Sequence, residues 1–185
     1  MDIRNDRFRI RNATAQDAKR LSGWWNNGSV MAHAGFPNGL GISEREIVEA
    51  LEKDNHLNRR LIIELDNEPV GEMSYRTPKE KMAEIGIKIC DVNQQNKGYG
   101  TEYLKMLMKH IFMSMEYNRI ILDTNLKNER AQHVYEKLGF RKTRIHVDSW
   151  RDQLGELQSS VDYEINRAEY MDLYCKEDIY LNHKK

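Results

Sequence analysis

The stretch that decides the fold is Gln95-Asn96-Lys97-Gly98-Tyr99-Gly100. It follows the apolar run Ile85-Gly86-Ile87-Lys88-Ile89 and precedes an amphipathic segment from Thr101 to Met115, an order that predicts a strand, a glycine-containing turn and a helix. Glycine has no Cβ atom, so the backbone can turn sharply and approach a ligand closely. The first N–H groups of a helix have no partner within it, and together with the helix dipole they bind anions. The stretch therefore predicts an anion site at the start of a helix.

The spacing of the glycines indicates which anion is bound. The stretch lacks the Gly-x-x-x-x-Gly-Lys-Ser/Thr of a nucleoside-triphosphate loop and the Gly-x-Gly-x-x-Gly of a dinucleotide-binding turn. The order Gln-x-x-Gly-x-Gly instead resembles the pyrophosphate loop of the GNAT superfamily of acetyl-CoA-dependent N-acetyltransferases. An ordinary strand-to-helix turn would also explain two glycines, so the identification needs a second motif.

That second motif lies one strand further along the chain. The short run from Arg119 to Thr124, rich in β-branched residues, predicts the strand. The segment from Asn128 to Phe140 then reads Asn-x-x-Ala-x-x-x-Tyr-x-x-x-Gly-Phe, which resembles the second signature of the same superfamily. It also predicts a helix, because Asn128 suits an N-cap and Gly139 suits a left-handed C-cap. The chain is accordingly identified as a member of the GNAT superfamily, with the resemblance sharpest from about residue 84 to residue 140.

The resemblance implies a single-domain α/β GNAT fold over residues 1–185. Apolar and alternating runs along the chain predict a mixed, largely antiparallel sheet of six or seven strands, flanked by about four helices. The tail from Arg167 to Lys185 is predicted to form a short helix followed by a frayed end. The irregular first loop, from Asn26 to Gly41, and the corner from Trp150 to Gly155 resemble the ribosomal-protein alanine N-acetyltransferase group.

The composition is that of a globular protein with no general affinity for nucleic acid. Of 185 residues, 39% are hydrophobic and 31% charged, and the 29 Lys and Arg residues balance 29 Asp and Glu residues, so no net basic field is available. Cys90 and Cys175 are far apart and have no metal-ligand spacing, which favours a reducing compartment and predicts no metal site. The N-terminus lacks the apolar core of a signal peptide, and no stretch reaches membrane-spanning length. We expect a cytoplasmic protein with no membrane partner.

The resemblance implies that acetyl-CoA is the co-substrate and assigns the residues that hold it. The loop that begins at Gln95 is expected to bind the diphosphate, mostly through backbone N–H groups. The strand before the loop splays from its neighbour in this superfamily, so free backbone groups of Ile89 and Cys90 are expected to bind the pantetheine arm. Asn128 is expected to contact that arm or the loop, and a helix cap would also explain it. The cofactor-binding residues are therefore predicted to be Ile89, Cys90, Gln95, Asn96, Lys97, Gly98, Tyr99, Gly100, Thr101 and Asn128.

The catalytic residues are predicted from the chemistry of acetyl transfer. Tyr135 holds the motif position at which the superfamily places a tyrosine hydroxyl beside the sulfur of coenzyme A, so we expect it to act as the general acid. A core tyrosine on an amphipathic helix is the alternative. The general base is assigned to Glu84, with Glu72 as a second candidate, because both lie on strands that flank the expected cleft. A solvated carboxylate on a strand face remains the alternative for each.

The acceptor site is expected in the irregular stretch after the first helix, since long loops over a rigid sheet often carry binding residues. Trp25, His33 and Phe36 are the predicted acceptor-binding residues, and packing or structural roles are the alternatives. The acceptor is predicted to be a primary amine, either a small molecule or a protein N-terminus. Acidic residues on the second predicted helix, Glu44, Glu46 and Glu49, suggest a cationic ligand or a solvated face. Dimers are frequent in the superfamily, so a homodimer is among the expected assemblies.

Two functions are compatible with these residues. The first is an N-acetyltransferase in which the amine attacks acetyl-CoA directly in a ternary complex. The second is a non-catalytic module that keeps the fold and senses acyl-CoA. The intact loop and the retained tyrosine favour the enzyme.

Overall fold

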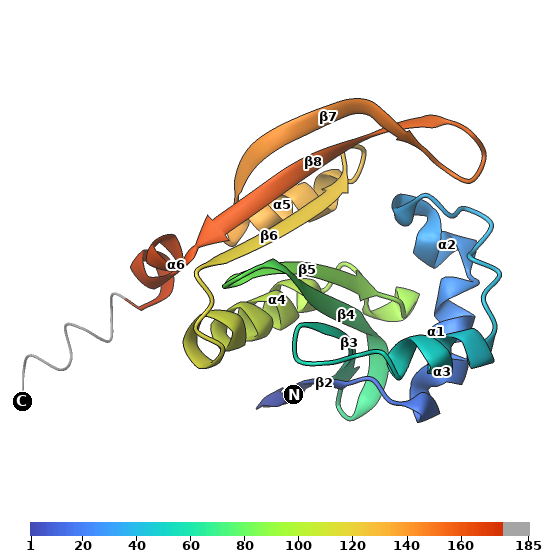
Figure 1. Ribbon diagram of the computed structural model, residues 1–185, viewed down its shortest axis with the longest axis horizontal. Helices are drawn as coiled ribbons and strands as arrows, with labels where there is room; N and C mark the ends of the chain where they lie inside the picture. The colour runs from blue at the N-terminus through green and yellow to red at the C-terminus, as the bar shows by residue number, and fades with distance from the viewer. Residues whose placement is uncertain (176–185) are drawn as a thin grey trace, which may run out of the picture.

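Eight strands pair into one mixed sheet in the computed structural model, which describes residues 1–175 (Figure 1). Their order across the sheet is β1-β2-β3-β4-β5-β6-β8-β7, and all neighbouring strands are antiparallel except β5 and β6. The strands are β1 (Asp2–Asn5), β2 (Phe8–Asn12), β3 (Asn58–Leu65), β4 (Glu68–Lys79), β5 (Met82–Ile89), β6 (Arg119–Asn125), β7 (Arg141–Arg151) and β8 (Leu157–Asn166).

Helices cover both faces of this sheet. The α-helices within residues 1–175 are α1 (Ala18–Trp25), α2 (Gly28–Met31), α3 (Glu44–Leu51), α4 (Tyr99–Lys109), α5 (Glu129–Lys137) and α6 (Arg167–Tyr174). Short 3-10 turns, including η2 (Ala32–Ala34), connect some of them, and α4 continues as a π-turn over His110–Ser114.

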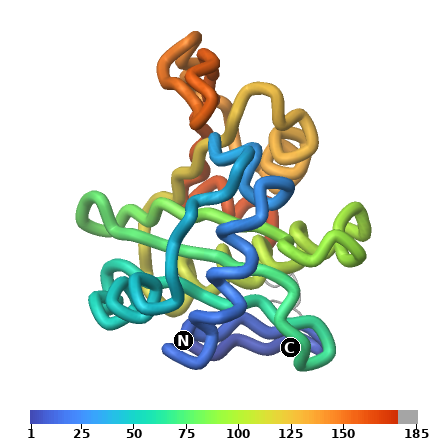
Figure 2. The backbone as a smooth tube through the Cα atoms, turned by 90° about the vertical axis from the view of Figure 1, so that its right-hand side faces the viewer, coloured from blue at the N-terminus to red at the C-terminus, as the bar shows by residue number. Residues whose placement is uncertain are grey.

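Alternation along β3 separates two hydrophobic cores. Leu61 and Ile63 are buried in the larger core, to which α4 and α5 contribute, whereas Ile62 between them is buried against α1 and α3. Because successive side chains of a strand point to opposite faces, α4 and α5 lie on one face of the sheet and α1 and α3 on the other. Figure 2 shows the chain from α1 to α2 crossing the second face toward the turn between β7 and β8.

The parallel strands β5 and β6 stay together for only part of their length. Pairing joins Met82–Glu84 to Arg119–Ile121, although β5 runs on to Ile89 and β6 to Asn125. The second halves of the two strands therefore diverge, and their facing backbone groups are not used in the sheet. Helix α4 begins beyond the end of β5 and α5 beyond the end of β6, so both helix N-termini open toward this divergence.

The caps predicted for α5 are confirmed. The side chain of Asn128 accepts a hydrogen bond from the N–H of Ala131 at 3.2 Å, which satisfies one of the free amides of the first turn. Gly139 comes directly after the helix with φ of +91°, the left-handed conformation expected at this end. Local sequence therefore determines where this helix begins and ends.

The strand and helix counts differ from the prediction. The sheet has eight strands because Asp2–Asn5 folds back on β2 through a two-residue turn, in which Asp6 adopts φ of +52°. That turn contains neither Gly nor Pro, so the sequence carries no strong hairpin signal there. Helix α2 adds a short element within the expected loop. The predicted helix in the tail is confirmed as α6, and the predicted frayed end lies outside the described residues.

Candidate active site

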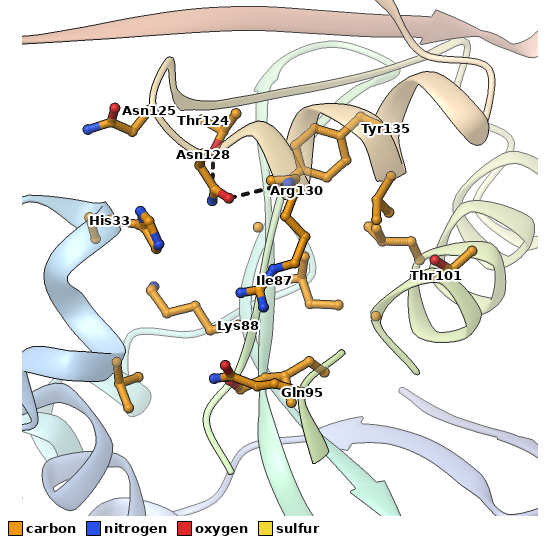
Figure 3. Close-up of a pocket in the computed structure, with 18 of the residues that line it drawn as sticks. His33, Ile87, Lys88, Gln95, Thr101, Thr124, Asn125, Asn128, Arg130 and Tyr135 are labelled. Carbon is orange, nitrogen blue, oxygen red and sulfur yellow. Dashed lines mark hydrogen bonds between the residues drawn. The ribbon is translucent and has the colours of Figure 1, made fainter. Parts of the chain in front are cut away.

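A cavity of about 820 Å³ occupies the divergence between β5 and β6 (Figure 3). One end is formed by the loop before α4 and by the first turns of α4 and α5, and the other end by α2, η2 and the turn region of β7. The lining residues are Ser29, Val30, His33, Ala34, Gly86, Ile87, Lys88, Ile89, Gln94, Gln95, Asn96, Gly98, Tyr99, Gly100, Thr101, Leu104, Asp123, Thr124, Asn125, Asn128, Arg130, Ala131, Val134, Tyr135, Trp150 and Ser160.

The predicted loop presents a run of free amides to this cavity. The amide of Gln95 donates to Val92 O at 3.3 Å and that of Thr101 donates to Gly98 O at 3.0 Å. Among the hydrogen bonds of residues 1–175, none engages the five amides between them, from Asn96 to Gly100. Asn96 (φ +60°) and Gly98 (φ +80°) are both left-handed, a geometry that gathers successive N–H groups into a concave anion site. The loop therefore fits a diphosphate.

The two glycines contribute in different ways. Gly98 is the N-cap of α4, and its positive φ would strain any side chain there. Gly100 has ordinary helical geometry, and a Cβ at this position would lie 4.0 Å from Ile87 and Ile89 of β5. That Cβ would occupy the space between the start of α4 and the open edge of β5. The absence of a side chain at Gly100 thus keeps the cradle open.

Two side-chain hydrogen bonds hold the loop in place. Gln95 donates from Nε2 to Ile89 O at 2.9 Å, which ties the loop to the end of β5. Arg130, in the first turn of α5, donates to Asn96 Oδ1 at 2.7 Å and so spans the mouth of the cavity. The ammonium of Lys97 instead donates to Gln94 at 3.3 Å, and Lys97 is not among the lining residues.

The exposed edge of β5 differs from the predicted one by a residue. The N–H of Cys90 donates to Val70 O of β4 at 2.9 Å, so this amide is not free for a ligand, which corrects the sequence-based assignment. Backbone groups alternate along a strand, and those of Ile87 and Ile89 are consequently directed toward β6. Burial raises the pKa of the Cys90 thiol to about 12, with the charge of Glu72 adding to the effect, so this thiol is no nucleophile.

Tyr135 lies where the motif predicts, on the cavity side of α5. Its ring packs edge-on against Tyr163, with ring centroids 5.6 Å apart, and the residue is 7% exposed. No hydrogen bond within residues 1–175 engages its hydroxyl. Because no fully buried side-chain N or O atom in this part of the chain lacks a partner, the hydroxyl is not fully buried and opens into the cavity. Burial raises the pKa of Tyr135, and the charge of Asp123 raises it further. The phenol is therefore protonated at neutral pH.

Glu72 does not occupy the position of a catalytic base. Its Oε1 accepts from Trp25 Nε1 at 2.9 Å and from Lys88 Nζ at 3.3 Å, and its Oε2 accepts from Arg60 at 2.9 Å. Both carboxylate oxygens are therefore already engaged by donors of the protein, and neither is presented to the cavity. Neither Glu72 nor Trp25 lines the cavity, because both are buried in its wall. This corrects the assignments of Glu72 to catalysis and of Trp25 to acceptor binding.

Glu84 is also displaced from the cavity. It lies in the half of β5 that still pairs with β6, and its carboxylate accepts from Arg76 at 2.7 Å. The residue is not among those that line the cavity, so it does not hold the predicted role of base by direct contact. The strand was predicted correctly, but the point at which β5 and β6 separate lies beyond Glu84.

Asp123 of β6 is the carboxylate that lines the cavity, and the sequence-based prediction missed it. Although solvent reaches its side chain, desolvation within the cleft raises its pKa, and the nearby carboxylates of Glu84 and Asp162 raise it further. A raised pKa moves the carboxylate toward the range suited to a general base. The signal in the sequence was an acid directly after the apolar run Ile120–Leu122, in the strand before the second motif.

The acceptor end is built by segments distant in sequence. Figure 3 shows Lys88 extending from β5 toward His33 of η2, and both residues line the cavity. The side chain of Gln153, in the turn between β7 and β8, donates to Gly39 O and accepts from the N–H of Asn38, each at 2.9 Å. The backbone N–H of Gln153 donates to Gly35 O at 2.8 Å. Predicted acceptor residue Phe36 is 38% exposed and lies outside the lining.

Trp150 completes this end of the cavity. A Cβ at Gly35 would lie 2.4 Å from its ring, so the absence of a side chain allows the loop and the indole to pack closely. Together, Trp150 and Gln153 join the β7–β8 turn to the loop after η2. We call this connection the bridge.

The acidic residues of α3 serve the helix itself. Glu46 forms a capping box with Ser43, and Glu49 pairs with Arg45 at 2.9 Å. Neither these residues nor Glu44 line the cavity. In residues 1–175, no cluster of three or more His, Cys, Asp or Glu side chains has a geometry that could hold a metal ion. Over the same residues, the helices are too short or too polar to cross a membrane.

A mixed sheet opened between two parallel strands, with a glycine-containing helix start facing the opening, defines the GNAT class of α/β folds. The chain belongs to the GNAT acetyltransferase family, since the model of that domain matches residues 7–141. Two structures show the same fold: a spermidine N-acetyltransferase from Vibrio cholerae in complex with CoA and spermine (TM-score 0.80, 21% identity, 90% of this chain and 99% of that one) and a GNAT-family acetyltransferase from Bacillus anthracis (TM-score 0.76, 24% identity, 91% and 99%).

Relatives found by sequence align with smaller shares of this chain than these structures do. The spermidine N(1)-acetyltransferase of Escherichia coli (strain K12) is 32% identical over 93 residues, which is 47% of this chain and half the length of that protein. An uncharacterized N-acetyltransferase of Bacillus subtilis (strain 168), YnaD, is 26% identical over 145 residues, covering 77% of this chain and 84% of that protein. These relatives do not point specifically to the ribosomal-protein alanine group.

Proposed function

We propose that the protein transfers an acetyl group from acetyl-CoA to a primary amine of a small molecule, by direct attack in a ternary complex. The observation that carries the proposal is the run of five free amides from Asn96 to Gly100, in a loop of which all residues but Lys97 line a cavity that Tyr135 also lines. Relatives that acetylate spermidine support an amine acceptor. The bridge over the acceptor end favours a small molecule over the N-terminus of a folded protein.

The cofactor end would hold acetyl-CoA chiefly through backbone groups. The free amides and the positive end of α4 suit the diphosphate, and Arg130 adds a cation at the mouth. The edge of β5 that does not pair with β6 offers the main-chain groups of Ile87 and the N–H of Ile89 to the pantetheine arm and the thioester oxygen, while the C=O of Ile89 already accepts from Gln95. Hydrogen bonds to that oxygen lower the barrier because they strengthen as its negative charge develops.

The chemistry then needs a base for the amine and an acid for sulfur. An alkylamine is mostly protonated at neutral pH, since its pKa is about 10. The acceptor therefore reacts as its neutral fraction, after one proton has been lost to solvent. Asp123 is the carboxylate proposed to take the second proton from the amine nitrogen as this attacks the acetyl carbon. The carbon–sulfur bond breaks, and the hydroxyl of Tyr135 donates its proton to the departing sulfur. Solvent then restores the proton of Tyr135 and removes that of Asp123.

The test is direct. Purified protein is incubated with acetyl-CoA and a broad panel of amines, with free thiol followed optically and acetylated products identified by mass spectrometry. Thiol release that depends on an amine, together with a matching product, supports the proposal. Binding of CoA without any acetylated product would favour the alternative of an acyl-CoA sensor. A cytoplasmic location, a homodimer and membership of the ribosomal-protein alanine subgroup stay predictions.

A further inference from the structure

We propose that the acceptor is a small amine that also carries an anionic group, and that Lys88 binds this group while the amine faces Asp123. The inference rests on the proposed acetyl transfer and names its substrate class. It comes from the charges that line the acceptor end of the cavity and from the way in which the fold holds Lys88.

The fold directs Lys88 into the acceptor end. Along β5, Ile87 and Ile89 pack against the larger core on the side of α4, so the residue between them points to the opposite face. On that face it meets α2 and η2, and Figure 3 shows its ammonium extending toward His33. The side chain is 32% exposed, which leaves the ammonium accessible from the cavity.

The charge of Lys88 is only partly neutralised within the protein. Its nearest acid, Glu72, accepts from Lys88 at 3.3 Å through an oxygen already bonded to Trp25 at 2.9 Å. The other oxygen of Glu72 is paired with Arg60 at 2.9 Å. One carboxylate therefore serves two cations, and this cluster keeps an excess positive charge. An ammonium has three donors, so Lys88 retains N–H groups for a ligand.

The charges of the lining residues argue against a polyamine as the acceptor. Spermidine and related polyamines carry several ammonium groups, but Asp123 is the one carboxylate among the lining residues, and Lys88 would repel a second ammonium. Glu84 and Asp162 strengthen the negative potential near Asp123, although each is already bonded, to Arg76 and His146 respectively. The cavity thus has a negative pole for one amine and a positive pole for an anion.

The bridge limits the size of such an acceptor. Gln153 makes three hydrogen bonds to the loop from Gly35 to Gly39, and Trp150 packs on Gly35. The acceptor end is therefore covered by two segments that are joined to each other. An amino acid or an aminoalkyl phosphonate fits these limits, and both share the chemistry of an amine linked to an anion.

The experiment compares matched acceptors. Glycine, β-alanine and γ-aminobutyrate are each assayed against their own amides, with aminoalkyl phosphonates as the second source of anion and spermidine as the polycation. We expect kcat/KM, corrected for the neutral fraction of each amine, to favour an anionic acceptor over its amide by about tenfold or more, as is typical of a charged hydrogen bond. Equal or better turnover of the amides or of spermidine would overturn the inference.

Variants of Lys88 assign the preference to one side chain. Lys88→Met should abolish the preference through a higher KM for anionic acceptors, with the KM for acetyl-CoA unchanged, and Lys88→Arg should retain most of it. Lys79→Met, at the exposed end of β4, is the matched control and should leave all parameters unchanged. A preference that survives Lys88→Met in folded protein would contradict the assignment.

A binding measurement separates this inference from the proposed function. Calorimetry of an N-acetylated acid and of its N-acetylated amide is carried out on protein saturated with CoA. If no amine is acetylated although CoA binds, the proposed function fails, while tighter binding of the acid that is lost in Lys88→Met would still support an anion site. Equal binding of the two compounds would overturn the anion site even in an active enzyme.

Discussion

The two ends of the cavity are built in different ways. The cofactor end comes from two continuous segments, the loop from Gln95 to Thr101 and the first turns of α5 from Asn128 to Tyr135. The acceptor end combines η2, Lys88, Asp123 and the bridge, in which Gln153 contacts residues more than a hundred positions earlier in the chain. Backbone geometry dominates at the first end and side-chain identity at the second.

This difference indicates that the cofactor end performs a function common to the family, whereas the acceptor end determines which amine the individual protein accepts. Backbone amides carry no information about the acceptor, so the same loop can serve any acetyl transfer. The acceptor end contains the charges, and these can change without disturbing the sheet. We therefore expect substitutions at the two ends to affect different kinetic parameters.

The largest expected effect is that of Asp123→Asn. Loss of the base should lower kcat by about 10²- to 10⁴-fold, the usual contribution of general acid–base catalysis, with the KM for acetyl-CoA unchanged. Because the base acts unprotonated and its pKa is raised, activity of the original protein should fall with decreasing pH at values above the ordinary aspartate pKa of about 4. Steady-state kinetics against pH measure both effects.

Glu84→Gln is the control for this residue, since Glu84 pairs with Arg76 outside the cavity. A larger loss of kcat in Glu84→Gln than in Asp123→Asn would return the role of base to the residue predicted from sequence. It would also show that β5 and β6 separate further in the active complex.

Tyr135→Phe should have the next largest effect, a fall in kcat of about 100-fold. The ring contacts with Tyr163 and Phe140 are retained, so stability and CoA affinity should change little. The raised pKa keeps the hydroxyl protonated into the alkaline range, so its ionisation should not limit activity near neutral pH. Tyr170→Phe, on α6, is the matched control, and comparable losses in the two variants would argue against a general acid.

Gly100→Ala probes the cofactor end alone. Its Cβ meets only Ile87 and Ile89 at 4.0 Å, so the fold should tolerate it, and alanine favours a helix over glycine by up to about 1 kcal/mol. CoA should nevertheless bind about tenfold more weakly, because the Cβ narrows the cradle and the charged hydrogen bonds there lengthen. Gly23→Ala in α1, with open space around its Cβ, is the control. Unchanged CoA affinity in a stable Gly100→Ala protein would place the diphosphate elsewhere.

Gln153→Ala should produce the smallest of these effects, confined to the acceptor end. Two side-chain hydrogen bonds are lost at an exposed site, which corresponds to about 1 kcal/mol of stability. The KM for the acceptor should rise a few-fold, because the bridge no longer orders the loop after η2, and CoA affinity should stay the same. Leu154→Ala, at an exposed neighbour in the same turn, is the control. Equal changes in the KM for the acceptor and in the affinity for CoA would contradict the distinction between the two ends.

The same contrast explains how far the sequence could predict the structure. The loop, the caps of α5 and the position of Tyr135 depend on nearby residues, and the structure places the loop, the N-cap Asn128 and Tyr135 at the cavity. Glu72 and Glu84 lie on the predicted strands, but where β5 and β6 separate is decided by pairing across the sheet. Asp123 and Gln153 were missed because their roles depend on distant partners.

The central claim is that the free amides from Asn96 to Gly100 bind the diphosphate of CoA, and amide hydrogen exchange tests it most directly. Exchange is followed by NMR in the free protein, with CoA and with pantetheine, which lacks the diphosphate. The account predicts fast exchange of these five amides in the free protein, strong protection with CoA and little with pantetheine. Unchanged exchange with CoA bound, or equal protection by pantetheine, would contradict it.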